Sequence, residues 1–219
     1  MLGVFTAFAT RYAGYLLVSL LIGMIAREYA RAFVTAKLGD PTPRLWGRLT
    51  LNPRQWFDPF GSGILPALIL ILWASNSAFL PPPIAYAKPA ALDPNYLRNR
   101  DRDVVIASLA GPVANLVLGL LGALVRQIGL PLEAVVAANA FALTNISLFV
   151  FHLMPIPGLD GARILARFLP VRARTVYTNL DQYLVLFILV IVFLLRGSLL
   201  DIVDALTNAV CGLVGGPCR

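Results

Sequence analysis

The sequence contains few charged residues, which make up only 13% of its 219 amino acids. Soluble domains are about a quarter charged and about half apolar, whereas 58% of this chain is apolar and its mean hydropathy is +0.78. This composition excludes an ordinary soluble domain. The chain also lacks internal repeats and low-complexity linkers. We therefore expect a single membrane domain over residues 1–219, with the lipid bilayer as its first partner.

Histidine and cysteine are scarce as well: the chain has one histidine, His152, and two cysteines, Cys211 and Cys218. The cysteines lie close together near the C-terminal end, where they would form a disulfide only if that tail lies outside the cytoplasm. The first residues are apolar but lack the basic leader and cleavage site of a secretory signal peptide. We expect this first segment to stay in place as a helix.

The apolar residues are gathered in runs that approach the ~20 residues needed to cross a bilayer. These runs are residues 2–26, 60–80, 104–125, 132–154 and 183–195. A further stretch, residues 198–214, mixes aspartates with leucines and valines, which predicts an amphipathic helix on the membrane surface.

The basic residues, which give a net charge of +7, lie mainly in the loops 37–59, 81–103 and 155–175. Their place between apolar runs indicates membrane orientation and argues against nucleic-acid binding. If residues 60–80 dip into the membrane and return, all three loops and their twelve Lys and Arg share one face. The positive-inside rule favours this path over five full crossings. It predicts four crossings plus a re-entrant segment in the cell inner (plasma) membrane, with both termini outside.

Three polar groups stand beside the apolar runs. Arg27 and Arg31 lie four residues apart, with Glu28 between them, so both arginines share one face of a helix. Asn115 ends the segment 110–115 within the third run, and Asp160 follows a proline-rich break after the fourth. Ionisable groups at membrane depth usually face a partner or a cavity. In the re-entrant arrangement Glu28 and Asp160 lie at the same membrane face and can meet.

Several ordered motifs point to one family. The chain reads Leu-Gly-Asp-Pro-Thr-Pro at 38–43, Gly-Arg-Leu-Thr-Leu-Asn-Pro at 47–53 and Ala-Lys-Pro at 87–89, followed by Asn115 and by Asp160 with Gly161. In this order they resemble the small bacterial site-2 proteases, intramembrane zinc peptidases of the M50 group. The resemblance covers about residues 12–170.

The resemblance implies an all-α polytopic membrane fold with a site-2-protease-like helical core over residues 12–170, a re-entrant segment and a short membrane-associated β segment. Residues 171–219 would add a C-terminal transmembrane helix and the amphipathic tail. The β segment corresponds to Gly47, Arg48, Leu49, Thr50, Leu51 and Asn52. In the family this edge is thought to accept an extended substrate, and strand addition to an exposed edge needs no metal.

The departures from the family pattern fall on its zinc site. The two histidine ligands of the family correspond to Arg27 and Arg31, and of the ligand set and general base only Asp160 and Glu28 remain. Arginine has no lone pair to offer a metal, because its guanidinium stays protonated. We therefore expect no zinc, no cofactor and no catalytic residue, with Glu28, Asn115 and Asp160 as vestiges. His152 is expected to bond a nearby carbonyl, and Asn115 a helix end or the re-entrant segment.

Charge counting predicts what the arginines do instead. In the family site a zinc ion offsets one glutamate and one aspartate, whereas here Arg27 and Arg31 would offset Glu28 and Asp160. We expect these four side chains to form a salt-bridge cluster. The leading hypothesis is a catalytically inactive homologue that binds another membrane protein or transmembrane segment, as a scaffold or accessory subunit. The alternative is a zinc-dependent intramembrane metalloprotease with an altered ligand set, in which His152 joins Glu28 and Asp160. A small transporter has little support, because no inverted repeat is present.

Overall fold

The computed structural model describes residues 2–74, 83–90, 92–125 and 128–193, together with residues 201, 205, 206, 208–210 and 212. This part of the chain is mostly helical and contains no β-strand. The α-helices are α1 (Leu2–Lys37), α2 (Thr42–Leu45), α3 (Leu65–Ala74), α4 (Arg100–Val125), α5 (Leu132–Leu153), α6 (Asp160–Ala166), α7 (Val171–Asn179) and α8 (Leu184–Phe193). Short turns of other helix types are η1 (Pro53–Gln55), η2 (Pro59–Ile64), η3 (Pro94–Tyr96) and η4 (Leu180–Tyr183).

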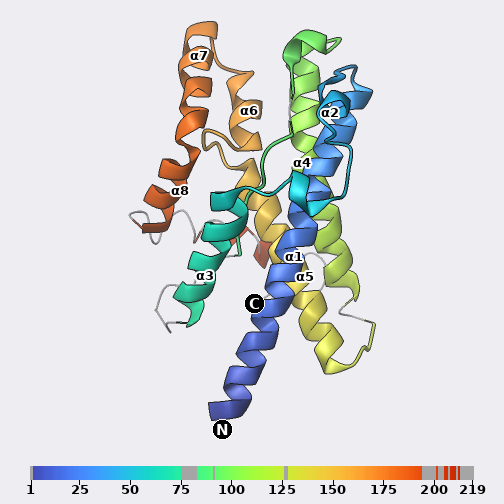
Figure 1. Ribbon diagram of the computed structural model, residues 1–219, viewed down its shortest axis with the longest axis vertical. Coiled ribbons are helices and arrows are strands. Elements are labelled where there is room, and N and C mark those ends of the chain that lie inside the picture. Colours follow the sequence, from blue (N-terminus) through green and yellow to red (C-terminus); the bar gives the residue numbers. More distant parts are fainter. Residues whose placement is uncertain are drawn as a thin grey trace.

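Helices α1, α4 and α5 form the centre of the molecule (Figure 1). Small residues let these helices approach closely. A Cβ atom on Gly119 of α4 would lie 2.5 Å from Cγ1 of Ile146 on α5, and one on Gly111 would lie 2.9 Å from Cγ of Arg27 on α1. Close approach at glycine is typical of helices that pack in membranes, where van der Waals contact drives association.

Two of the described helices, α4 and α5, are long and apolar enough to cross a membrane. Their 26 and 22 residues correspond to about 39 and 33 Å at ~1.5 Å per residue, against ~30 Å of hydrocarbon. The outer face of α4 exposes Val113, Val117 and Leu121 at helical spacing. Soluble monomers rarely expose so continuous an apolar face. These helices and this exposed face agree with the membrane protein predicted from the sequence.

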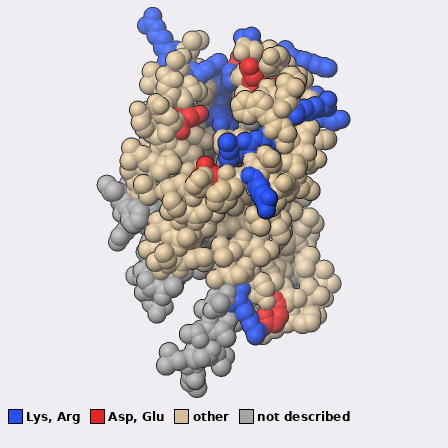
Figure 2. Space-filling model, in the orientation of Figure 1, with Lys and Arg blue, Asp and Glu red and all other residues tan. Residues whose placement is uncertain are grey.

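The three basic loops lie together at one end of the molecule. The carboxylate of Asp40, after α1, accepts hydrogen bonds from the backbone nitrogens of Thr42 at 2.8 Å and Asp93 at 2.7 Å. Asp101, at the start of α4, pairs with Arg167 at 2.8 Å and Arg174 at 3.3 Å. Figure 2 shows Lys and Arg gathered over this end. A full crossing by residues 60–80 would have put loops 37–59 and 81–103 at opposite ends.

Two described segments, residues 59–74 and 83–90, keep these loops together. The first contains η2 and α3, and the second lies against the beginning of the first: the Tyr86 nitrogen donates to the Gly61 carbonyl at 3.2 Å, and the Lys88 nitrogen to the Trp56 carbonyl at 2.9 Å. A Cβ on Gly61 would lie only 2.4 Å from the Tyr86 carbonyl oxygen, so glycine is needed there. Asp58 caps η2 by accepting from the Phe60 and Gly61 nitrogens.

The β segment predicted at Gly47–Asn52 is not confirmed. Gly47 occupies a turn with φ of +64°, and the Arg48 nitrogen donates to the Pro43 carbonyl at 2.7 Å. The Thr50 carbonyl accepts from Nε1 of Trp56 at 2.9 Å, and the Asn52 nitrogen donates to the Thr50 hydroxyl at 3.2 Å. Several backbone groups of this segment are therefore bonded within its own loop. Pairing with side chains and turns has replaced the ladder expected for a strand.

The predicted C-terminal features are only partly within the described residues. Run 183–195 contains α8, and the scattered described residues after it are helical. Val210 packs against the α4–α5 contact formed by Ala123, Ala142, Leu143 and Ile146. Cys211 and Cys218, and with them the predicted disulfide, lie outside the described residues.

Candidate functional site

The polar residues singled out on α1 and α6 meet where three segments converge. Arg27, Glu28 and Arg31 lie in α1, and Asp160 is the first residue of α6. The break before α6 turns at Gly158, whose φ is +91°. A Cβ on Gly161 would lie 2.1 Å from the carbonyl oxygen of Leu153. This glycine lets the start of α6 pack directly on the end of α5, and so fixes Asp160 next to α1.

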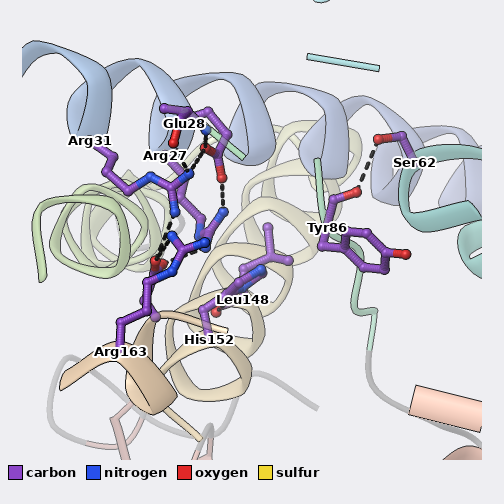
Figure 3. Close-up of polar contacts among 10 residues, drawn as sticks. Arg27, Glu28, Arg31, Ser62, Tyr86, Leu148, His152 and Arg163 are labelled. Atoms are coloured by element: carbon purple, nitrogen blue, oxygen red, sulfur yellow. Dashed lines mark hydrogen bonds and ion pairs between the residues drawn. The ribbon is translucent and has the colours of Figure 1, made fainter. Parts of the chain in front are cut away.

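Each arginine bridges both carboxylates, and Figure 3 shows the side chains of Arg27 and Arg31 beside Glu28. Arg27 donates through Nη1 to Glu28 and through Nη2 to Asp160. Arg31 lies 2.9 Å from Glu28 Oε2 and donates to Asp160 Oδ1 at 3.0 Å. All four residues are at most 4% exposed. Two cations and two anions thus form a closed, electrically neutral ring in the interior, which we call the arginine–carboxylate cluster.

The cluster also holds the peptide group of Ala90. Glu28 Oε2 accepts from the Ala90 nitrogen at 2.8 Å, and Arg31 Nη2 donates to the Ala90 carbonyl at 3.0 Å. Ala90 ends the segment 83–90, which is itself largely buried. The cluster therefore links α1, α6 and the segment 83–90. Sequence reasoning missed this contact, because nothing in a run of alanine and proline marks a backbone group as a partner.

A fifth charged side chain stands at the edge of the cluster. Nη1 of Arg163 lies 3.7 Å from Asp160 Oδ1, three residues along the same helix. Burial by itself raises the pKa of Asp160, but the positive charges of Arg27, Arg31 and Arg163 outweigh burial and hold this pKa below its ordinary value. Asp160 is therefore ionised throughout the physiological range. The spacing from Asp160 to Arg163 was the available sequence signal, since residues three apart are neighbours on a helix.

His152 lies beside the cluster. Its Nδ1 is 2.9 Å from the carbonyl oxygen of Leu148, the kind of partner expected for it. A carbonyl only accepts, so Nδ1 carries the proton and Nε2 is left as the nitrogen with a lone pair. Nε2 is buried, with no hydrogen-bond partner among the described residues. His152 also lines a cavity of about 20 Å³ with Arg27, Glu28 and Arg31, room for about one water molecule.

Asn115 is fully buried on α4, one helical turn from the Gly111–Arg27 contact. Both atoms of its amide lack a hydrogen-bond partner within the described part of the chain. The expected bond to a helix end or to the re-entrant segment is therefore not observed. Asn115 is not part of the ring of ion pairs.

The donor chemistry of the site does not suit zinc. Among the residues that the structure describes, no three or more His, Cys, Asp and Glu side chains are grouped to hold a metal ion. Every carboxylate oxygen of the cluster is already in an ion pair with a guanidinium. Zinc sites use thiolate, imidazole or carboxylate donors, and two guanidinium groups at the same place would repel a divalent cation.

Comparison with known proteins gives sequence relatives only: no protein-family model and no solved structure matches the chain. It is 32% identical over 179 residues to "Putative zinc metalloprotease YwhC" of Bacillus subtilis, which covers 77% of this chain and 75% of that protein. It is 32% identical over 174 residues to "Putative zinc metalloprotease Rip2" of Mycobacterium tuberculosis, covering 78% of this chain and 63% of that protein. The protein of the same name in Mycolicibacterium smegmatis is 35% identical over 144 residues, covering 64% and 52%.

These matches extend over most of the described helical core and agree with the ordered motifs of the sequence. At this identity and coverage the relationship extends well beyond single motifs. The chain belongs to the site-2 protease (M50 peptidase) family.

Proposed function

We propose that this chain is a catalytically inactive member of its family that acts as a binding, scaffold or accessory subunit in a membrane complex. The observation that carries the proposal is the double bridging of Glu28 and Asp160 by Arg27 and Arg31. The two arginines stand at the positions that the resemblance assigns to histidine ligands. They neutralise both acids without a metal, and the site then needs no cofactor.

Glu28 is poorly placed to act as a general base. Its Oε1 accepts a hydrogen bond from Arg27. Its Oε2 is in an ion pair with Arg31 and accepts a hydrogen bond from the Ala90 nitrogen. A general base must reach the proton of a water or substrate within hydrogen-bond distance. In a zinc peptidase the metal activates that water. Here both carboxylate oxygens of Glu28 are already paired with guanidinium or amide donors.

We expect a partner to bind the outer surface of the helices. The apolar outer faces of α1 and α4 suit a transmembrane segment, and the basic loops suit the cytoplasmic side of an inner (plasma) membrane crossed several times. In this orientation the N-terminus is extracytoplasmic. A partner is expected to be another membrane protein rather than a nucleic acid.

One observation favours the alternative of an active metalloprotease with an altered ligand set. Nε2 of His152 offers a lone pair, has no partner among the described residues, and belongs to a side chain lining the same cavity as Glu28. A metal ion held by His152 and the two acids would first have to displace both guanidinium groups. This requirement is why the inactive form is the leading proposal.

Metal analysis of the purified protein in mild detergent separates the two functions. We expect wild-type protein to carry far less than one zinc per chain. The double variant Arg27→His/Arg31→His, which restores imidazole donors at those positions, should gain about one zinc per chain, and adding Asp160→Ala should remove it. Stoichiometric zinc in the wild type, lost in Asp160→Ala, would establish the metalloprotease instead. A pull-down from the native membrane with mass spectrometry would then identify the partner of the inactive form.

A further inference from the structure

Helix α7 and the turn before it are exposed at the basic end of the molecule. Phe168, in the turn between α6 and α7, is 78% exposed, and Val171, the first residue of α7, is 75% exposed. Val176, further along the helix, is 65% exposed. No residue of α7 is buried. Short helices are normally stabilised by burial of one face, so α7 has surface left for a partner.

Polar contacts hold this exposed region in place. Arg174 of α7 donates through Nε to the Ala166 carbonyl at 2.9 Å and through Nη2 to the Arg167 carbonyl at 3.0 Å. Nη1 of Arg174 and Nη1 of Arg167 both donate to Asp101 at the start of α4, at 3.3 and 2.8 Å. The turn and the first part of α7 are therefore fixed relative to α6 and α4.

This region carries positive charge only. Residues 161–180 contain four arginines and no aspartate or glutamate. Two of these arginines, Arg167 and Arg174, share the single carboxylate of Asp101. Arg172 is exposed and takes part in no ion pair among the described residues. An acidic partner would therefore meet one unpaired guanidinium and two that are only partly compensated.

The apolar side chains at the start of α7 are expected to lie beyond the membrane surface. The chain is helical from α7 through η4 into α8, which falls in the predicted crossing 183–195, and Figure 1 shows α7 above α8 along the long axis. Val171 is about 20 Å from Leu184 at ~1.5 Å per residue, whereas each interfacial layer of a bilayer is less than about 8 Å thick. Membrane orientation accounts for the arginines but not for apolar side chains at this distance.

We propose that Phe168, Val171 and Arg172, which we call the α7 surface, bind an acidic segment of a soluble cytoplasmic protein. Acidic side chains of the segment pair with Arg172, and an apolar side chain covers Phe168 and Val171. Aromatic residues and arginine are enriched in protein interfaces, and complementary charge selects the partner and speeds its association.

This inference deepens the proposed function by naming a second partner surface, and it rests on that function for the cytoplasmic orientation of the basic end. The two can fail separately. Stoichiometric zinc in the purified wild type would reject the inactive scaffold and leave the contact at the α7 surface standing.

Photocrosslinking in cells identifies what covers the α7 surface. Phe168 of the full chain is replaced by p-benzoylphenylalanine, and Tyr96, 57% exposed in the basic loop 81–103, is replaced in the matched control. We expect irradiation to join the Phe168 position to a cytoplasmic protein through a segment of net negative charge, and the Tyr96 position to give no such adduct. An adduct with lipid, with a second copy of this chain or with a neutral or basic segment would overturn the proposal, as would the absence of an adduct.

Binding of the crosslinked segment tests the charge. A fluorescent synthetic peptide with the sequence of that segment is titrated with the purified full chain in mild detergent, and binding is read from its anisotropy. Arg172→Glu should raise the Kd at least fivefold, whereas Arg44→Glu, the same charge change at an exposed residue of loop 37–59, should change it less than twofold. Raising the salt from about 0.05 M to about 0.5 M should also weaken binding, because salt screens exposed charges. Equal affinities of wild type and Arg172→Glu would overturn recognition of an acidic segment at this surface.

Discussion

Two groups of ion pairs, at opposite ends of the α1–α5 contact, use the same chemistry in different surroundings. Near the beginning of α1, Arg11 pairs with Glu133 at 3.0 Å, and these side chains are 66% and 61% exposed. Further along α1, Arg31 pairs with Asp160 at the same 3.0 Å, and those side chains are 2% and 0% exposed. The distance is identical, and the two pairs differ in burial.

The difference shows why only one of these groups determines the structure. An exposed pair exchanges water for a partner at little net gain, and salt screens it. A buried pair has already lost its water, so removing one member leaves an uncompensated charge in the interior. The arginine–carboxylate cluster should therefore control how α1, α6 and the Ala90 segment stay together, whereas the Arg11–Glu133 pair should not.

The largest effect is expected from Asp160→Ala. The variant leaves Arg27 and Arg31 facing only Glu28, and loss of one partner from a buried pair costs about 3–5 kcal/mol. Thermal unfolding in mild detergent should show a markedly lower Tm. Asp101→Ala is the matched control, since Asp101 also pairs with two arginines but has a side chain that is 64% exposed; its Tm should change little. Equal Tm values for wild type and Asp160→Ala would reject the cluster as a stabilising unit.

A double substitution that removes one charge of each sign tests the buried cluster further. Glu28→Leu and Arg31→Leu each leave an unpaired charge, whereas the double variant removes one charge of each sign and leaves Arg27 with Asp160. Replacing buried ion pairs by apolar residues is often neutral. The double variant should therefore be more stable than either single variant, with a coupling of at least about 1 kcal/mol between the sites. Additive losses in the Tm series would mean that the two residues act independently.

Lowering the pH should have an intermediate effect on the Tm. Burial raises the pKa of Asp160, but Arg27, Arg31 and Arg163 together lower it below its ordinary value. A carboxylate with a depressed folded-state pKa contributes stability that is present above its unfolded pKa of about 3.9 and is lost as the pH falls toward the folded value. The Tm should thus stay level from about pH 8 to about pH 5 and fall below about pH 4. The fall should be shallower in Asp160→Asn; a fall centred near pH 6.5 would instead indicate an imidazole-dependent site.

The sequence could predict the cluster because two local facts were enough. Arg27 and Arg31 share a helix face through their spacing, and the distribution of basic loops placed Glu28 and Asp160 at one end of the molecule. The structure brings all four side chains together. It also extends α1 to Lys37, past the apolar run that ends at residue 26, because helix propensity does not depend on a residue being apolar.

Other parts of the site depended on contacts that no local pattern encodes. The peptide group of Ala90 reaches Glu28 only because residues 83–90 lie back along residues 56–61, a path fixed by the close approach at Gly61. The resemblance to the family implied a strand over residues 47–52. The Arg48–Trp56 stack and the bond from Trp56 to Thr50 instead fold that segment onto itself. Tertiary contacts of single side chains decided both outcomes.

The smallest change in Tm is expected at the exposed Arg11–Glu133 pair. This change is the lower limit against which the buried cluster is compared. Glu133→Gln removes the negative charge that pairs with Arg11 and leaves one amide oxygen where two carboxylate oxygens accept from Arg11 and from the Tyr15 hydroxyl, each at 3.0 Å. Water can take over both contacts, so the Tm of this variant should equal that of the wild type within measurement error, at low and at high salt. A loss comparable to that of Asp160→Ala would show that the beginning of α1 is buried in the native membrane by a partner that covers Arg11 and Glu133. Burial in the isolated chain would then no longer be what separates the two groups of ion pairs.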